Sequence, residues 1–157
     1  MIELNGSRDG RGLRLALVVS RYNDFVTRRL EAGALAALEG AGVEDSMITV
    51  LRVPGAFEVP AAARKAAETG RFDAIVCLGC LIRGETPHFD YIASASSHAL
   101  AQASGATGVP ITFGILTTNS AEEALARAGG GSSNKGYEAA VAAVEMATLY
   151  RQIASRG

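Results

Sequence analysis

The sequence predicts an α/β protein, a three-layer α/β/α sandwich with a central four-stranded parallel sheet. Two observations lead to this prediction. Four apolar runs, rich in β-branched residues, are separated by segments of helical periodicity. The runs are continuous, which is typical of strands covered on both faces. Strands separated by helices join into a parallel sheet through right-handed crossovers, so helices are expected on both faces.

Each apolar run has the length of a strand. The four expected strands are LRLALVVS (13–20), MITVLRV (47–53), DAIVCLG (73–79) and VPITFGILT (109–117). In a parallel sheet of this kind, ligands bind beyond the carboxyl ends of the strands. That rule selects the loops SRYND, PGAFE, GCLIRGETPH and LTTNS as the place to search for chemistry.

The helices follow from apolar spacing and from their end signals. The first expected helix ends at the glycines of EGAG and carries Phe25, Val26, Leu30, Ala34, Leu35 and Leu38 on one face. The second follows PGAFEVP, where Pro60 fits only the first turn. The third begins at His88 and stops near Gly105, with Thr86 as its cap and Pro87 in its first position.

Two further helices are expected after the fourth strand. The tetrapeptide SAEE is a capping box in which Ser120 caps the helix and Glu123 reaches back. A long final helix is expected from about Lys135 onward.

Length and composition describe an ordinary single domain, spanning residues 1–157. The chain is 48% hydrophobic and carries a net charge of −1, with no basic face, which argues against nucleic acid as a partner. The first residues, MIELNGSRDG, contain no apolar leader, and no apolar run approaches membrane-spanning length. We therefore expect a cytoplasmic protein without a membrane partner.

The only two cysteines lie in CLGC, at Cys77 and Cys80. This spacing occurs in redox pairs and in half zinc sites. Residues three apart on a strand face opposite sides, so the two sulfurs should not converge. We expect small core and pocket residues here, and no metal site.

Two features suggest that the chain associates with copies of itself. The alternating tripeptide IEL near the N-terminus suits an edge strand that is added to a neighbouring subunit. Alanine-rich helices also permit close helix–helix approach.

The third loop carries the strongest chemical signal. His88 lies where a strand leads into a helix, behind Arg83 and Gly84. A helix N-terminus has free N–H groups and a dipole that favour an anion, so a phosphate or carboxylate is expected there, with Arg127 as a candidate partner. His88 is either a buried core histidine or a group that transfers protons, and its place at the rim of the expected cleft favours proton transfer.

Three other side chains complete this picture. Tyr22 follows the first strand and can stack on a planar ring. Glu58 lies in the first turn of the second helix and can accept hydrogen bonds from hydroxyl groups, whereas Phe113 is a core residue by default. No Walker or dinucleotide-binding pattern is present. Together the residues indicate a cleft for a planar, hydroxylated molecule and an anion, with one histidine to move protons.

These segments resemble one family. SRYND, VPGAFEVP, GCLIRGETPHFDYIA, GVPITFGILTTNS and NKGYEAA are similar, in order and spacing, to segments of the 6,7-dimethyl-8-ribityllumazine synthases. The resemblance covers essentially the whole chain. It implies a flavodoxin-like sheet and the condensation of 5-amino-6-(D-ribitylamino)uracil with 3,4-dihydroxy-2-butanone 4-phosphate, a step of riboflavin biosynthesis that needs no metal or organic cofactor.

The resemblance also implies roles for individual residues. Tyr22 would stack on the pyrimidine, and His88 would transfer protons. Arg127 would pair with the phosphate, with Lys135 as a further candidate nearby and with N–H groups from Glu85 and Thr86. The ring and ribityl chain would be held by Ala56, Phe57, Glu58, Cys80, Leu81, Ile82 and Phe113.

Members of this family form homopentamers, pairs of pentamers or icosahedral shells of sixty subunits, with active sites at subunit interfaces. The resemblance therefore implies a homo-oligomer, with riboflavin synthase as a further candidate partner. Two other functions stay open: a flavin- or lumazine-binding or shell-forming protein without turnover, and a riboflavin synthase of the archaeal type.

Overall fold

Four parallel strands form the central layer of the computed structural model, which describes residues 1–156. The strands are β1 (Leu15–Ser20), β2 (Ile48–Val53), β3 (Ala74–Ile82) and β4 (Ile111–Thr118), in the spatial order β2-β1-β3-β4. This arrangement confirms the predicted four-stranded parallel sheet. It places β2 and β4 at the two edges and buries β1 along its whole length.

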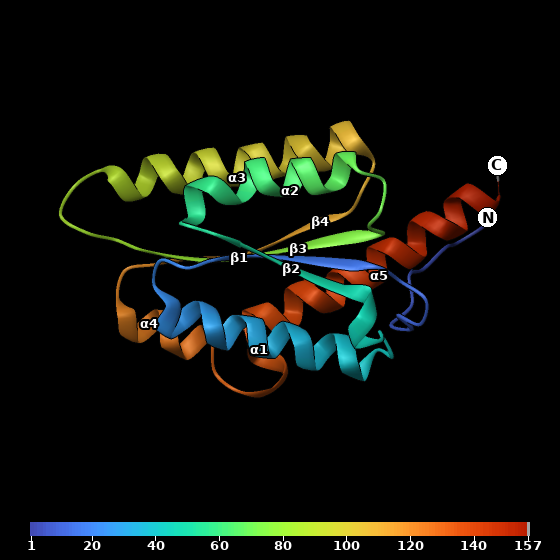
Figure 1. The fold of residues 1–157 in the computed structure, drawn as a ribbon, viewed down its shortest axis with the longest axis horizontal. Coiled ribbons are helices and arrows are strands. Elements are labelled where there is room, and N and C mark those ends of the chain that lie inside the picture. The colour runs from blue at the N-terminus through green and yellow to red at the C-terminus, as the bar shows by residue number, and fades with distance from the viewer. Residues whose placement is uncertain (157) are drawn as a thin grey trace.

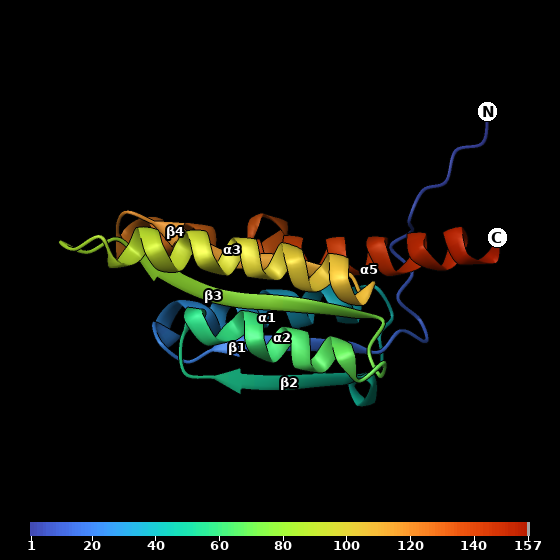
Figure 2. The same cartoon turned by 90° about the horizontal axis from the view of Figure 1, so that it is seen from above.

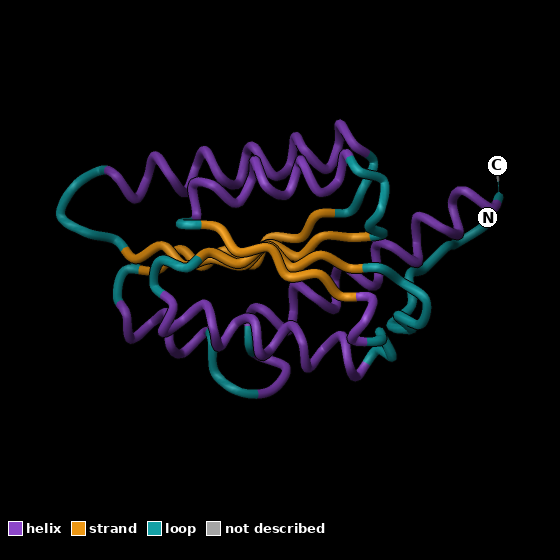
Figure 3. Tube along the Cα trace, in the orientation of Figure 1, coloured by secondary structure: helices purple, strands orange, loops and turns teal. Residues whose placement is uncertain are grey.

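Helices cover both faces of the sheet, as Figure 1 and Figure 3 show. One face carries α2 (Val59–Glu68) and α3 (His88–Thr107). The other carries α1 (Asp24–Gly40), α4 (Ala121–Arg127) and α5 (Lys135–Ser155). The predicted α/β/α sandwich is therefore correct.

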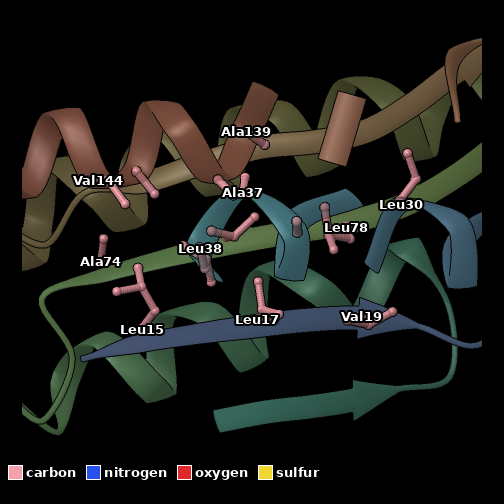
Figure 4. Packing of buried hydrophobic residues seen from close by; sticks show 14 of the residues in the cluster. Leu15, Leu17, Val19, Leu30, Ala37, Leu38, Ala74, Leu78, Ala139 and Val144 are labelled. Atoms are coloured by element: carbon pink, nitrogen blue, oxygen red, sulfur yellow. The ribbon is translucent and has the colours of Figure 1, made fainter. Parts of the chain in front are cut away.

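The core has two halves, one on each face of the sheet. Leu15, Leu17 and Val19 point from β1 toward α1 and α5, where Leu30, Leu38 and Val144 pack on them (Figure 4). The intervening residues Ala16 and Val18 point toward α2 and α3. Because both faces of β1 are covered, its sequence has no polar alternation.

The strand boundaries differ from the predicted ones by up to three residues, and the ends of β3 and α3 both lie further along the chain than predicted. β3 continues to Ile82 because it pairs with β4 as far as Thr118, so Cys80, Leu81 and Ile82 belong to the strand and not to the following loop. Helix α3 continues past Gly105 to Thr107. Gly108 then ends it with a positive φ of 72°, a conformation that glycine adopts without strain.

The N-terminal segment, residues 1–14, contains no strand in this chain. Hydrogen bonds and an ion pair bind it to α5. Gln152 donates from Nε2 to the carbonyl of Asn5 at 2.6 Å, the amide of Ser7 donates to Thr148 Oγ1 at 2.8 Å, and Arg8 pairs with Glu145 at 3.1 Å. Figure 2 shows the first residues leaving the layers altogether. Their addition to a neighbour's sheet stays a prediction.

Candidate active site

The loop after β1 is bound to the end of β2. The amide of Arg21 donates to the carbonyl of Val53 at 2.8 Å, and the amide of Tyr22 donates to the carbonyl of Pro54 at 3.0 Å. These bonds hold Tyr22 beside the PGAFE turn. Its side chain is 72% exposed, which leaves the ring accessible to a partner.

Asn23 fixes the same loop to β3, and the sequence analysis missed it. Its φ of 62° is the only positive value at a non-glycine residue in the described chain. Asparagine tolerates this left-handed conformation better than most residues. Its Nδ2 donates to the carbonyl of Cys80 at 3.0 Å. The sequence feature that could have indicated this role is an asparagine placed directly between a predicted strand and a predicted helix.

The PGAFE turn forms a short 3₁₀ helix, Ala56–Glu58, ahead of α2. Ala56 is buried and its carbonyl accepts a hydrogen bond of 3.5 Å from Ser96 of α3. Phe57 is 64% exposed, and Glu58 is partly exposed. An exposed phenylalanine and an accessible carboxylate therefore follow β2, next to Tyr22.

The end of β3 brings Cys80, Leu81 and Ile82 to the same edge. Cys80 points toward the face covered by α1 and α5, whereas Cys77 points toward α2 and α3, as predicted. Burial raises the pKa of the Cys80 thiol to about 11, and it raises the pKa of Cys77 further. Two neutral thiols on opposite faces cannot form a redox pair or share a metal.

The loop after β3 leads into α3. Glu85 and Thr86 are exposed, and Thr86 Oγ1 accepts a hydrogen bond of 3.4 Å from the amide of His88. The helix begins at His88, as predicted, but its cap is Pro87 instead of Thr86. The side chain of His88 is exposed, which excludes the buried-core interpretation.

Three other candidate residues lie apart from this group. Phe113, Arg127 and Lys135 line a groove of about 480 Å³ along β4 and the start of α5. None of the candidates that follow β1, β2 and β3 lines this groove. The candidate residues thus form two sets. The carboxyl-end set lies at the carboxyl ends of the strands, and the groove set lies on β4, α4 and α5.

The expectation that Phe113 is a core residue is wrong. Its side chain is 46% exposed, because β4 is an edge strand with no further strand beside it in this chain. In the same groove Arg127 donates to the carbonyl of Glu123 at 3.3 Å, and Lys135 pairs with Glu138 at 2.9 Å. Both cations are held only by exposed contacts, so they can turn toward an anion.

The capping box at the start of α4 is present in a shifted form. Ser120 Oγ accepts from the amide of Glu123 at 3.1 Å, as predicted. The carboxylate of Glu123 accepts from the amide of Asn119 at 3.0 Å instead of that of Ser120. The cap fixes the turn that follows β4.

Across residues 1–156, no cluster of three or more His, Cys, Asp and Glu side chains could hold a metal ion. In the same residues, every helix is too short or too polar to cross a membrane.

The carboxyl-end set has a definite chemical capacity. It offers two exposed aromatic rings, a carboxylate, the N-terminus of a 20-residue helix and an exposed imidazole at that terminus. Aromatic faces bind planar rings, and helix N-termini bind anions. The groove set adds a third aromatic ring and two cations.

Comparison with known proteins identifies one family. The family model described as 6,7-dimethyl-8-ribityllumazine synthase matches residues 12–151. A protein of Chlorobium phaeobacteroides with that name is 49% identical over 150 residues, which cover 96% of this chain and 97% of the relative. A protein of Chlorobium luteolum with the same name is 48% identical over 151 residues, at 96% and 97% coverage.

Proposed function

Because the chain belongs to the 6,7-dimethyl-8-ribityllumazine synthase family, we infer that it catalyses the reaction for which the family is named. It condenses 5-amino-6-(D-ribitylamino)uracil with 3,4-dihydroxy-2-butanone 4-phosphate and releases phosphate and water, a step of riboflavin biosynthesis. The observation that carries this conclusion is the family match over residues 12–151, which includes every candidate site residue.

The carboxyl-end residues are suited to the uracil substrate. The ring of Tyr22 would stack on the pyrimidine, with Phe57 beside it. Glu58 would accept hydrogen bonds from the ribityl hydroxyls, because a carboxylate is an acceptor only. Backbone and side-chain atoms of Ala56, Cys80, Leu81 and Ile82 would form the floor on which the ring lies.

The phosphate of the second substrate would bind at the start of α3. The amides of Glu85 and Thr86 precede the helix, and the helix dipole stabilises negative charge there. Arg127 would pair with the same phosphate, and Lys135 would add a second cation. A phosphate held in this way is also stabilised as it leaves.

His88 lies at the start of that helix and would move the protons of the reaction. The 5-amino group attacks the ketone and loses water to give a Schiff base. A proton is then removed next to the imine carbon and phosphate departs from the terminal carbon. The enol that this elimination leaves takes up a proton at its terminal carbon and becomes a ketone. The ribitylamino nitrogen finally attacks this new carbonyl, and a second water is lost as the ring closes. No electrons are transferred to an external acceptor in this sequence.

One complete site would combine two subunits. Phe113 of β4, Arg127 of α4 and Lys135 of α5 line a groove whose lining includes none of the carboxyl-end residues of the same chain. In a ring of subunits, the groove set of one chain would meet the carboxyl-end set of its neighbour. A homo-oligomer built of pentamers therefore accounts for the separation of the two sets.

The test is a product assay with the purified protein. The two substrates are mixed with and without the protein, and lumazine absorbance and released phosphate are followed together. We expect one phosphate per lumazine, at a rate well above the spontaneous condensation. Binding of substrates or riboflavin at the spontaneous rate would instead show a binding or shell protein without turnover.

The alternative function, a riboflavin synthase of the archaeal type, predicts a different product. Such an enzyme would convert supplied 6,7-dimethyl-8-ribityllumazine into riboflavin, which has its own absorbance. Riboflavin formation in this assay, without lumazine formation in the first one, would contradict the proposed function.

A further inference from the structure

Arg83 lies outside both candidate sets, yet its side chain contacts three residues around the start of α3. Its Nη1 pairs with both carboxylate oxygens of Asp90 at 3.2 Å, and its Nε donates to Asn119 Oδ1 at 3.1 Å. Its guanidinium carbon lies 4.4 Å from the centroid of the Phe89 ring. Its own amide donates to the carbonyl of Thr118 at 2.8 Å.

These contacts join the first turn of α3 to the turn that follows β4. Asp90 and Phe89 belong to the first turn of α3, immediately after His88. Asn119 belongs to the turn between β4 and α4, which the Glu123 carboxylate already fixes through the Asn119 amide. The exposed loop of residues 84–87 lies between Arg83 and α3, so the Arg83 side chain spans the loop that carries Glu85 and Thr86.

The side chain of arginine is suited to this function. Its planar guanidinium can donate in two directions while its face rests on an aromatic ring. The ammonium of lysine is a point charge and lacks that geometry. Each exposed ion pair contributes little by itself. Here, however, one planar group makes all three contacts, and Phe89 beneath it is only 9% exposed.

Arg83 could also have been a direct ligand of the anion, since it is close in sequence to the expected phosphate site. The geometry disfavours this, because Nε and Nη1 are both directed to protein acceptors. The two functions predict different behaviour for Asn119 and Asp90. Substitution of Asn119 or Asp90 should impair activity if Arg83 positions the loop, and should leave activity unchanged if Arg83 binds the phosphate by itself.

We propose that Arg83 is a positioning residue that clamps the start of α3 to the turn after β4, and so holds His88 and the amides of Glu85 and Thr86 in their working geometry. The proposal rests on the proposed function. It adds a residue that touches no substrate and acts through the loop it spans.

The experiment compares Arg83→Met, Arg83→Lys, Asn119→Ala and Asp90→Asn with the unaltered protein. Arg71→Met is the matched control, because Arg71 also lies near a phenylalanine, Phe72, at 5.8 Å, but just before β3 at the opposite end of the sheet. Hydrogen exchange of peptides covering residues 84–92 is measured without substrate. The kcat and the KM for the phosphate substrate are measured separately.

We expect Arg83→Met to speed exchange in residues 84–92, to lower kcat and to raise that KM, with kcat/KM falling about tenfold or more, because small displacements of reacting groups are costly. Asn119→Ala and Asp90→Asn should each reproduce part of both effects. Arg83→Lys should stay impaired, and Arg71→Met should resemble the unaltered protein in both measurements.

Unchanged exchange in Arg83→Met would show that no clamp exists. Faster exchange with unchanged kinetics would show that the clamp does not position catalytic groups. Full activity in Arg83→Lys, with silent Asn119 and Asp90 variants, would identify a direct electrostatic ligand and overturn the proposal. Failure of the unaltered protein to make lumazine would count against the proposed function instead, because the exchange measurement needs no substrate.

Discussion

At the scale of single residues, position distinguishes side chains of the same type. His88 and His98 are both exposed and both lie on α3, but His88 begins the helix and His98 lies well inside it. Cys77 and Cys80 share a strand and point to opposite faces. Tyr22 is exposed on a loop that hydrogen bonds hold beside the next strand end.

His88→Ala should lower kcat substantially and leave the fold intact, since the side chain is exposed. General acid–base catalysis contributes about 10²–10⁴-fold to the rate. The spontaneous condensation of the substrates limits how large a loss can be observed. Steady-state kinetics corrected for the uncatalysed rate provide the measurement. His98→Ala is the control and should retain full activity; a fully active His88→Ala would show that the imidazole moves no proton.

Tyr22→Ala should weaken binding of the ribitylaminouracil by about 1–3 kcal/mol, if the ring stacks as aromatic side chains do on bases. Tyr22→Phe keeps the ring and should bind almost as well as the unaltered protein. Isothermal titration of the three proteins measures the difference. Equal affinities would place the pyrimidine elsewhere.

The two thiols should make the free energy of unfolding fall as the pH rises through the alkaline range. Their pKa values are raised by burial, to about 11 for Cys80 against an ordinary value of 9.0, so the folded state holds the thiol protons more tightly than the unfolded state. This contribution is fully present below pH 9 and is lost as the pH rises through the folded pKa values.

Urea unfolding at pH 8 and pH 10 tests this expectation. The midpoint of the unaltered protein should fall over this interval by more than that of the double variant Cys77→Ala/Cys80→Ala. Because both proteins contain every other titrating group, the difference between their two midpoint shifts isolates the contribution of the thiols. An equal decrease of the urea midpoint in both proteins would show that the thiols do not cause the pH dependence.

At the scale of elements, the start of α5 is held firmly against α1. Asn134 caps α5 by accepting from the amides of Gly136 and Tyr137, and its Nδ2 donates to the carbonyls of Arg29 and Gly129. A Cβ at Gly136 would overlap the carbonyl oxygen of Leu30. The close contact of the two helices fixes the helix end from which Lys135 projects into the groove.

Gly136→Ala should therefore destabilise the fold by about 1–3 kcal/mol, because α1 and α5 must separate to admit the methyl group. Gly105→Ala is the matched control, since a Cβ at Gly105 on α3 meets open space. It should stabilise the fold by about 0.5–1 kcal/mol, through the lower conformational entropy of alanine in the unfolded chain. Denaturant unfolding of both variants gives the comparison, and a neutral Gly136→Ala would contradict the tight contact.

At the scale of the whole molecule, the proposed site shared between subunits would make catalysis depend on assembly. The groove with Phe113 and Arg127 is lined by β4, α4 and α5, whereas His88 and Tyr22 follow the carboxyl ends of inner strands. An isolated chain would leave the phosphate without its arginine. A hydrogen bond to a charged group contributes about 1.5–3 kcal/mol, enough to be seen in the affinity for the phosphate substrate.

Co-assembly of His88→Ala with Arg127→Ala tests the shared site. The two variants are unfolded together and refolded, so that mixed rings contain some interfaces with both native residues and some with neither. Activity should exceed that of either variant alone, and also that of the two variants mixed without unfolding. Absence of any gain, in rings that native mass measurement shows to be mixed, would rule out the shared site.

Sequence patterns were sufficient to predict the kind and order of the elements, the parallel sheet and the loops that carry the carboxyl-end residues. Those properties depend on local patterns: continuous apolar runs, helical spacing, and end signals such as Ser120 and Pro60. The tertiary structure alone decided how far β3 extends, that Phe113 is exposed, that Asn23 binds Cys80 and that Arg83 spans the loop before His88. Each of these depends on which strand lies at an edge or which segment lies alongside, and such contacts join residues that no local pattern relates.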